Sequence, residues 1–149
     1  MKLFTNKGNT PGNFMARILV IDDDQLYVKL MVHALEQRGH EVEFALDGIA
    51  GVRRFAASHF DAVVCDIVMP EQEGVQTIKQ IRLTRSDVAI VAISGGLSFS
   101  HSANIDVLEI AGKLGADVTL KKPFQLSELC SAVEAALAAR RDAAARARA

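Results

Sequence analysis

The fold is decided by the stretch ILVIDDD at residues 18–24, in which a run of branched apolar side chains ends abruptly in three acids. An apolar run of this length without polar alternation is typical of a strand that is buried on both faces, as in a parallel sheet. The chain then takes up a helical period from about Asp24 to Arg38, with Asp24 as the expected N-cap and Gly39 as the C-terminal stop. The stretch therefore opens a strand-helix unit.

The same alternation of apolar run and helical period follows four more times. It predicts strands near residues 42–45, 62–65, 88–93 and 118–120, and helices near 49–58, 75–83, 103–114 and 126–141. Five short apolar strands alternating with helices favour an α/β fold of (βα)5 type. This is a doubly wound parallel five-stranded sheet with flavodoxin-like topology, because right-handed crossovers place the helices on both faces. Such a sheet binds ligands at the carboxyl ends of its strands.

The composition predicts one domain and excludes several classes of function. The 149 residues, half of them apolar, suffice for one buried core, and we expect no DNA-binding or other output domain. Seventeen Lys and Arg nearly cancel eighteen Asp and Glu, which argues against a nucleic-acid binder. The longest apolar run, at residues 88–93, is far shorter than the roughly 20 residues that a membrane-spanning helix needs.

The two cysteines bear on the cellular compartment. Cys65 falls in a predicted strand and Cys130 in a predicted amphipathic helix, and the N-terminal residues lack the pattern of a secretory leader. Two buried thiols in a reducing environment are the simpler interpretation. We therefore expect a cytoplasmic protein without a membrane span.

Both ends of the chain are expected to lie outside the compact domain, which we place at residues 17–141. The first residues are polar and have no sustained period, so residues 1–16 are predicted to form a flexible arm. Residues 142–149 form a basic tail that is rich in Ala and Arg. We expect this tail to be a frayed, exposed helical end, with a basic handle for an acidic partner surface as the alternative.

Polar side chains stand at the predicted strand ends, where a ligand is expected. Asp22 and Asp23 follow the first strand, Asp66 the third, Ser94 the fourth and Lys122 the fifth. Two carboxylates about 4 Å apart repel each other by roughly 4 kcal/mol at an effective dielectric constant near 20, so three together need a cation or a raised pKa. An all-oxygen set of this kind suits Mg2+, which shares its coordination shell readily with a phosphate.

These residues predict phosphoryl chemistry. With the metal beside it, Asp66 can attack a phosphoryl donor, while Lys122 and the Ser94 hydroxyl bind the oxygens of the transferred group. The expected product is an acyl phosphate on Asp66. Asp24 is interpreted as a helix cap, and no cofactor other than the metal is expected.

The combination resembles the receiver domain of response regulators. It comprises Asp22-Asp23, the run from Asp66 to Met69-Pro70 with Gly74 four residues further on, Ser94, and Lys122-Pro123-Phe124. The resemblance covers residues 17–141. It implies that Asp66 is the phosphoacceptor, that Asp23 binds Mg2+ directly and Asp22 largely through water, and that the Val68 carbonyl is a further ligand. It also implies a cis Lys122-Pro123 bond and a Ser94 that moves toward the phosphoryl group.

The same resemblance implies a function in two-component phosphorelay signalling. A stand-alone regulator would accept phosphate from a histidine kinase or a histidine phosphotransfer protein, and would catalyse only its own phosphorylation and dephosphorylation. It would then relay the phosphate or bind a downstream protein through the fourth helix, fifth strand and fifth helix. The sequence leaves homodimerisation open.

Two features depart from the family pattern. The stretch from Gly95 to Gly112 is longer than expected, and Thr119 stands where many receivers carry an aromatic switch side chain, while the single tyrosine, Tyr27, lies elsewhere in the sequence. Two other functions stay open at this point. One is a haloacid-dehalogenase-type phosphatase with Asp22 as nucleophile, and the other is a receiver-like scaffold that binds without phosphorylation.

Overall fold

The structure is a computed structural model that describes residues 15–67, 73–94, 109 and 112–148. The elements are β1 (Arg17–Ile21), α1 (Gln25–Gln37), β2 (Glu41–Ala45), α2 (Gly48–Ala57), β3 (Ala62–Asp66), α3 (Glu73–Thr84), β4 (Ala89–Ser94), β5 (Val118–Lys121) and α5 (Leu126–Arg148). All strand pairs are parallel, in the order β2-β1-β3-β4-β5. The predicted fold class is thereby confirmed. Most of the helix predicted at 103–114 lies outside the described residues.

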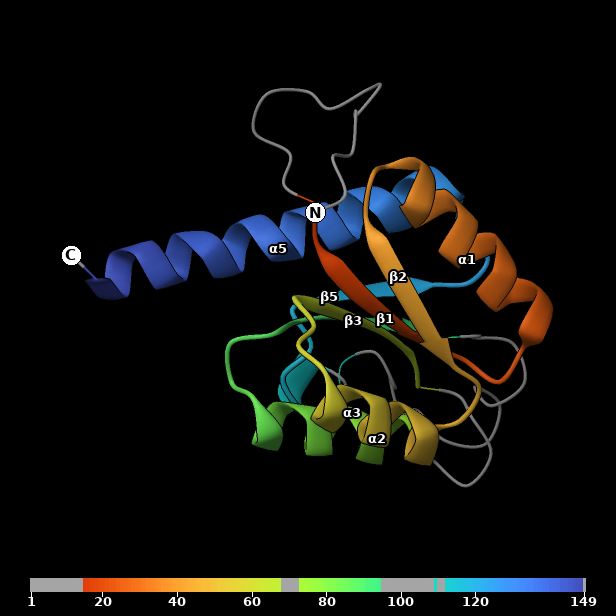
Figure 1. Cartoon of the computed structure of the whole chain (residues 1–149), viewed down its shortest axis with the longest axis horizontal. Helices are drawn as coiled ribbons and strands as arrows, with labels where there is room; N and C mark the ends of the chain where they lie inside the picture. Colours follow the sequence, from red (N-terminus) through yellow and green to blue (C-terminus); the bar gives the residue numbers. More distant parts are fainter. Residues whose placement is uncertain (1–14, 68–72, 95–108, 110–111, 149) are drawn as a thin grey trace.

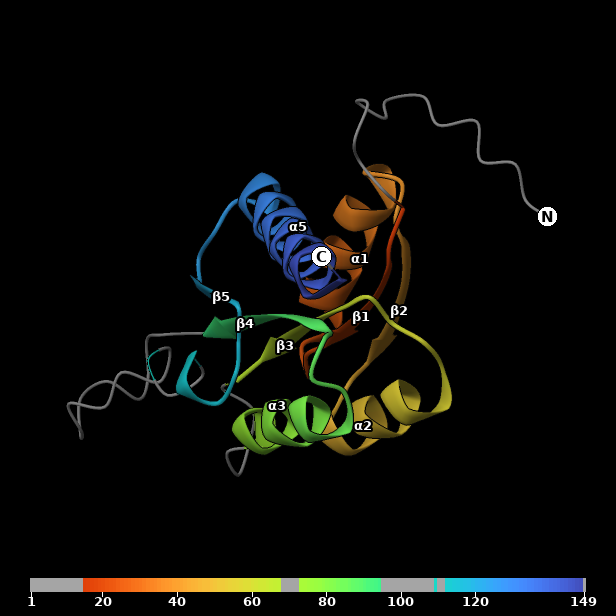
Figure 2. The same ribbon diagram turned by 90° about the vertical axis from the view of Figure 1, so that its left-hand side faces the viewer.

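Helices cover the sheet on both sides, which explains the unbroken apolar strands. α1 and α5 lie on one face, and α2 and α3 lie on the other (Figures 1 and 2). In β1, Ile18 and Val20 enter the core beneath α1 and α5, whereas Leu19 and Ile21 enter the core beneath α2 and α3. All four side chains are fully buried. Because each face of the strand meets a different apolar layer, no position from Ile18 to Ile21 tolerates a polar residue.

The start and end of α1 follow the predicted signals. The Asp24 carboxylate accepts hydrogen bonds from the backbone N–H groups of Leu26 (3.0 Å) and Tyr27 (3.2 Å), which otherwise have no partner in the first helical turn. Gly39 follows the helix with a φ of 92°, a conformation that favours glycine. Asp24 is thus occupied as a cap, as expected.

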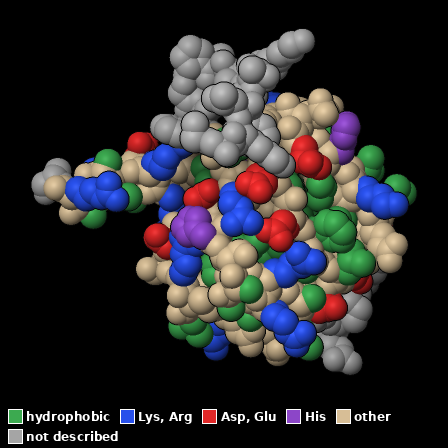
Figure 3. Space-filling view, in the orientation of Figure 1, with side chains coloured by type: hydrophobic (Ala, Val, Ile, Leu, Met, Phe, Trp, Pro, Cys, Tyr) green, Lys and Arg blue, Asp and Glu red, His purple; other side chains and the backbone are tan. Residues whose placement is uncertain are grey.

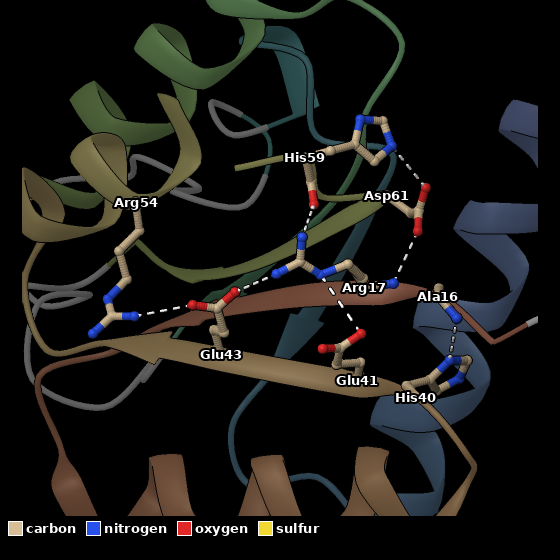
Figure 4. A network of polar contacts seen from close by, with 8 residues as sticks. All are labelled: Ala16, Arg17, His40, Glu41, Glu43, Arg54, His59 and Asp61. Carbon is tan, nitrogen blue, oxygen red and sulfur yellow. Dashed lines mark hydrogen bonds and ion pairs between the residues drawn. The ribbon is translucent and has the colours of Figure 1, made fainter. Parts of the chain in front are cut away.

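Charged side chains gather at the amino-terminal edge of the sheet, opposite the predicted ligand edge. Acidic and basic groups are intermixed on this face rather than sorted into a patch of one sign (Figure 3). Arg17 donates to Glu43 Oε2 (2.6 Å) and to the His59 carbonyl oxygen (3.1 Å), and its backbone N–H donates to Asp61 (2.8 Å) (Figure 4). Arg54 donates to Glu43 from α2 (3.1 Å). The network ties β1, β2 and the start of β3 together. It lies at the end of the sheet opposite the predicted ligand edge.

Helix α5 continues past the predicted end of the domain, to Arg148, and its last turns project beyond the sheet (Figure 1). Residues 141–148 are exposed, in agreement with the expected exposed helical end. Arg140 behaves differently from the arginines that follow it. It donates to Asp117 Oδ1 (2.6 Å) and to the Ser86 carbonyl oxygen (3.1 Å), and Arg82 also contacts the Asp117 carboxylate (3.3 Å). The helix is therefore fastened at Arg140 to the loops that precede β4 and β5.

This contact predicts different effects for two arginines of α5. Arg140→Ala should lower the free energy of unfolding by about 1 kcal/mol, because it breaks a partly buried ion pair and a second hydrogen bond. Arg146→Ala should change it by less than about 0.5 kcal/mol, because the residue is exposed. Urea unfolding of both variants at low and high salt measures the difference. Equal losses would show that Arg140 does not anchor the helix.

Candidate functional site

The strand register brings the predicted acids together. Ile21 of β1 pairs with Cys65 of β3, so the next residues along the two strands, Asp22 and Asp66, are neighbours at the carboxyl edge of the sheet. Asp22 is fully buried and Asp66 is 4% exposed, whereas Asp23 is exposed. Carboxylate oxygens of the three residues lie within 4.8 Å of one another. Within the described ranges, these three acids form a group that could hold a metal ion, and its all-oxygen ligands are those that the sequence predicts.

Asp22 is held rigidly at the base of the site. Its Oδ1 accepts a hydrogen bond from the Asp24 backbone N–H (2.9 Å), and its Oδ2 accepts one from Lys122 Nζ (3.1 Å). Burial raises the pKa of Asp22 to about 6; the Asp24 hydrogen bond opposes the rise, Asp66 adds to it, and Lys122 opposes it. The raised pKa means that burial disfavours the charged form of Asp22. A nearby cation stabilises that charged form.

Lys122 links the two buried acids. Its Nζ lies 3.1 Å from Asp22 Oδ2 and 3.1 Å from Asp66 Oδ2. Burial by itself would lower the pKa of Lys122, but the charges of Asp66 and Asp22, together with the hydrogen bonds to both, raise it overall. The lysine is consequently a fixed positive charge beside Asp66. The Lys122-Pro123 bond is cis, as the resemblance implies.

The remaining predicted residues occupy the same edge or lie outside the described part. Ser94 ends β4 beside Lys121 and is buried, and its carbonyl oxygen accepts a hydrogen bond from the Lys122 backbone N–H (2.8 Å). Val68, whose carbonyl was the expected fourth metal ligand, lies outside the described residues, as does the opening of the long loop at Gly95.

Two contributions to the site do not follow from the sequence pattern. Gly74 lies at the start of α3, packed so closely against the end of β3 that a Cβ there would overlap the Asp66 carbonyl oxygen and Ile67 Cα. Tyr27 places its ring over Lys122, with the ring centroid 4.3 Å from Nζ. Tyr27 stands in the first turn of α1, which leaves this edge of the sheet, so its position near the edge follows from the sequence. Its contact with the lysine does not.

The fold and the site together define a doubly wound α/β module that carries two buried carboxylates, one exposed carboxylate and a lysine at one edge of its sheet. Comparison with known proteins identifies it further. The model of the response regulator receiver domain matches residues 18–134. The chain therefore belongs to the response regulator receiver family, a signalling module of two-component systems rather than a catalytic enzyme.

Individual relatives agree with this family. The response regulator MprA of Mycobacterium sp. (strain KMS) is 36% identical over 122 residues, which cover 81% of this chain and 50% of the relative. The chain thus matches about half the length of this curated relative. A response regulator receiver domain from Clostridium thermocellum is 29% identical with a TM-score of 0.74, over 85% of this chain and 98% of that one. NtrX from Brucella abortus is 26% identical with a TM-score of 0.80, over 91% of this chain and 29% of that one.

Proposed function

We propose that this chain accepts a phosphoryl group on Asp66, in a step that depends on Mg2+, from the phosphohistidine of a histidine kinase or of a histidine phosphotransfer protein. The observation that carries the proposal is the convergence of Asp22, Asp23 and Asp66 on one small volume, with Lys122 bound to the two buried members. An all-oxygen donor set of this size and charge fits Mg2+. When bound, Mg2+ supplies the positive charge that offsets the negative charge of the transferred group.

Each side chain of the site has a separate role in the proposed phosphoryl transfer. An Asp66 carboxylate oxygen forms a bond to phosphorus, and the bond from phosphorus to the donor's histidine nitrogen breaks, with the electron pair staying on that nitrogen. The Lys122 ammonium, already within 3.1 Å of Asp66 Oδ2, pairs with the oxygens of the phosphoryl group. Ser94 binds a further oxygen and moves with it. Asp22, Asp23 and Asp66 would hold the metal, with Asp22 acting largely through water.

Membership of the receiver family implies a histidine kinase partner. We propose that the chain acts in the cytoplasm as a stand-alone regulator, with residues 17–141 as the working domain. Its phosphorylated surface would either bind a downstream protein or pass the phosphate on. β5 and α5 supply the described part of the expected docking face. No helix in the described ranges has the length and apolar character that crossing a membrane requires.

The test of this function is phosphorylation by a small donor. The full chain incubated with phosphoramidate and Mg2+ should gain the mass of one phosphoryl group, in a linkage that hydroxylamine cleaves as it cleaves an acyl phosphate. The same incubation with EDTA in place of Mg2+ should give no gain. Absence of labelling in both would favour the phosphorylation-independent scaffold.

The metal site makes a separate prediction about two neighbouring acids. Asp23→Ala should weaken Mg2+ binding by at least about tenfold, because it removes a charged oxygen ligand from the three-acid cluster. Asp24→Ala should change the affinity by less than about threefold, because that carboxylate is occupied by two backbone N–H groups of α1. A titration with Mg2+ followed by calorimetry compares the two variants. Equal losses of affinity would place the metal elsewhere.

A further inference from the structure

The ammonium group of Lys122 has a third neighbour besides its two acids. Its Nζ has three N–H donors, and the carboxylates of Asp22 and Asp66 account for two of them. The ring of Tyr27 lies on the ammonium at 4.3 Å from Nζ to the centroid, which is well within the range of a cation–π interaction. Lys122 is therefore enclosed by two carboxylates and one aromatic face, and its side chain is only 17% exposed.

Tyr27 is itself held in place from two directions. Its backbone N–H is bound by the Asp24 cap, which fixes the first turn of α1. Its ring meets the ring of Phe124 edge to face, with centroids 5.7 Å apart and an interplanar angle of 80°. Phe124 stands two residues after Lys122 in the chain, so Tyr27 contacts both the reactive side chain and the segment that carries it. This arrangement joins α1 to the strand end at which Lys122 works.

We propose that Tyr27 is a positioning residue for phosphoryl transfer. Its ring shields the Lys122 ammonium from water and holds it toward Asp66. The proposal rests on the function proposed above and assigns that site one more participant. The ring face replaces water on the open side of the ammonium, so the electrostatic attraction between Lys122 and the transferred phosphoryl group acts in a less screened environment. Without the ring, the lysine hydrates and occupies several rotamers, and fewer molecules hold it at the reacting oxygen.

The first experiment detects the contact in the unphosphorylated protein. Tyr27 is the single tyrosine of the chain, so labelling with 3-fluorotyrosine gives one 19F resonance. Lys122→Ala should shift this resonance, because it removes the cation over the ring. Lys121→Ala is the matched control and should leave it unchanged, since Lys121 is the neighbouring lysine and is exposed. An unshifted resonance in the Lys122 variant would overturn the proposed contact, whether or not the chain can be phosphorylated.

The second experiment measures the consequence for phosphoryl transfer. At saturating phosphoramidate and Mg2+, Tyr27→Leu should be phosphorylated about five- to tenfold more slowly than wild type, which is the range expected when a partly buried cation–π contact is lost. The Mg2+ concentration for half-saturation should change by less than about twofold, because no metal ligand is altered. Tyr27→Phe keeps the ring face and should retain most of the rate. Tyr27→Met serves the same purpose as the leucine variant if that variant unfolds.

A double variant separates positioning from packing. In a Lys122→Ala background, Tyr27→Leu should cause no further loss of rate, because the lysine through which it acts is gone. The same fold loss in both backgrounds would overturn the proposal, and so would a Tyr27→Leu protein that is phosphorylated at the wild-type rate. These outcomes all require a wild-type chain that accepts phosphate. A wild-type chain that accepts none refutes the proposed function instead, and the 19F comparison still decides the contact.

Discussion

Asp66→Asn should reduce phosphorylation by phosphoramidate and Mg2+ to the level of a sample without protein. The amide cannot act as the nucleophile and is a poor ligand for a hard divalent ion, so both parts of the proposed step are lost together. We expect the fold to persist, because the amide matches the carboxylate in size and its loss of charge relieves the repulsion with Asp22. Intact mass spectrometry of treated protein gives the extent of labelling, and circular dichroism gives the fold.

Asp87→Asn is the matched control for this variant. The Asp87 carboxylate is 76% exposed and pairs with Arg85 before β4, far along the chain from the three-acid cluster. Its amide variant should be labelled to the wild-type extent. Full labelling of Asp66→Asn, with the control also labelled, would mean that another side chain accepts the phosphate.

Gly74→Ala should cost about 2 kcal/mol of unfolding free energy and weaken Mg2+ binding. A Cβ at this position would overlap the Asp66 carbonyl oxygen and Ile67 Cα, which are backbone atoms and cannot turn aside. Alanine would favour the helix over glycine by roughly 1 kcal/mol, but overpacking against a strand end costs about 1–3 kcal/mol or more, so the overlap decides the sign. α3 must then move away from the end of β3, which disturbs the Asp66 backbone.

The control for Gly74→Ala is another helical glycine, Gly112. A Cβ at Gly112 meets no described atom within 4 Å, so alanine there should leave stability unchanged or raise it by about 0.5–1 kcal/mol. Urea unfolding and a Mg2+ titration of both variants make the comparison. A Gly74→Ala protein with wild-type stability would show that α3 does not approach β3 as closely as described.

The sheet and its acidic edge were predictable because both follow from short-range patterns. Branched apolar runs such as residues 18–21 can be buried on both faces only in a sheet covered by helices, and parallel strands bring their carboxyl ends to one edge. From this alone Asp22, Asp66 and Lys122 were expected to meet, and the structure places Lys122 Nζ within hydrogen-bonding distance of both acids. Asp24 was likewise recognisable as a cap from its place before an apolar helical period.

Contacts that depend on how layers pack were not predictable. Tyr27 reaches Lys122 because α1 leaves the same sheet edge at an angle that only the packing sets. The same holds for Gly74, because its place in the sequence motif does not reveal which backbone atoms it contacts. The pairing of Arg140 with Asp117 is likewise set by packing, because the two residues are distant in sequence. Each of these residues contacts a partner that the local sequence pattern does not specify.

The central claim is that Asp66, and no other side chain, carries the phosphoryl group. The most direct test is to phosphorylate the full chain with phosphoramidate and Mg2+, reduce the acyl phosphate with borohydride, and locate the modified residue by peptide mass spectrometry. The account predicts one modified position, Asp66, and none when Mg2+ is replaced by EDTA. Modification of Asp22 would indicate the phosphatase-type nucleophile, and a chain without any modified carboxylate would contradict phosphorylation as the function of this site.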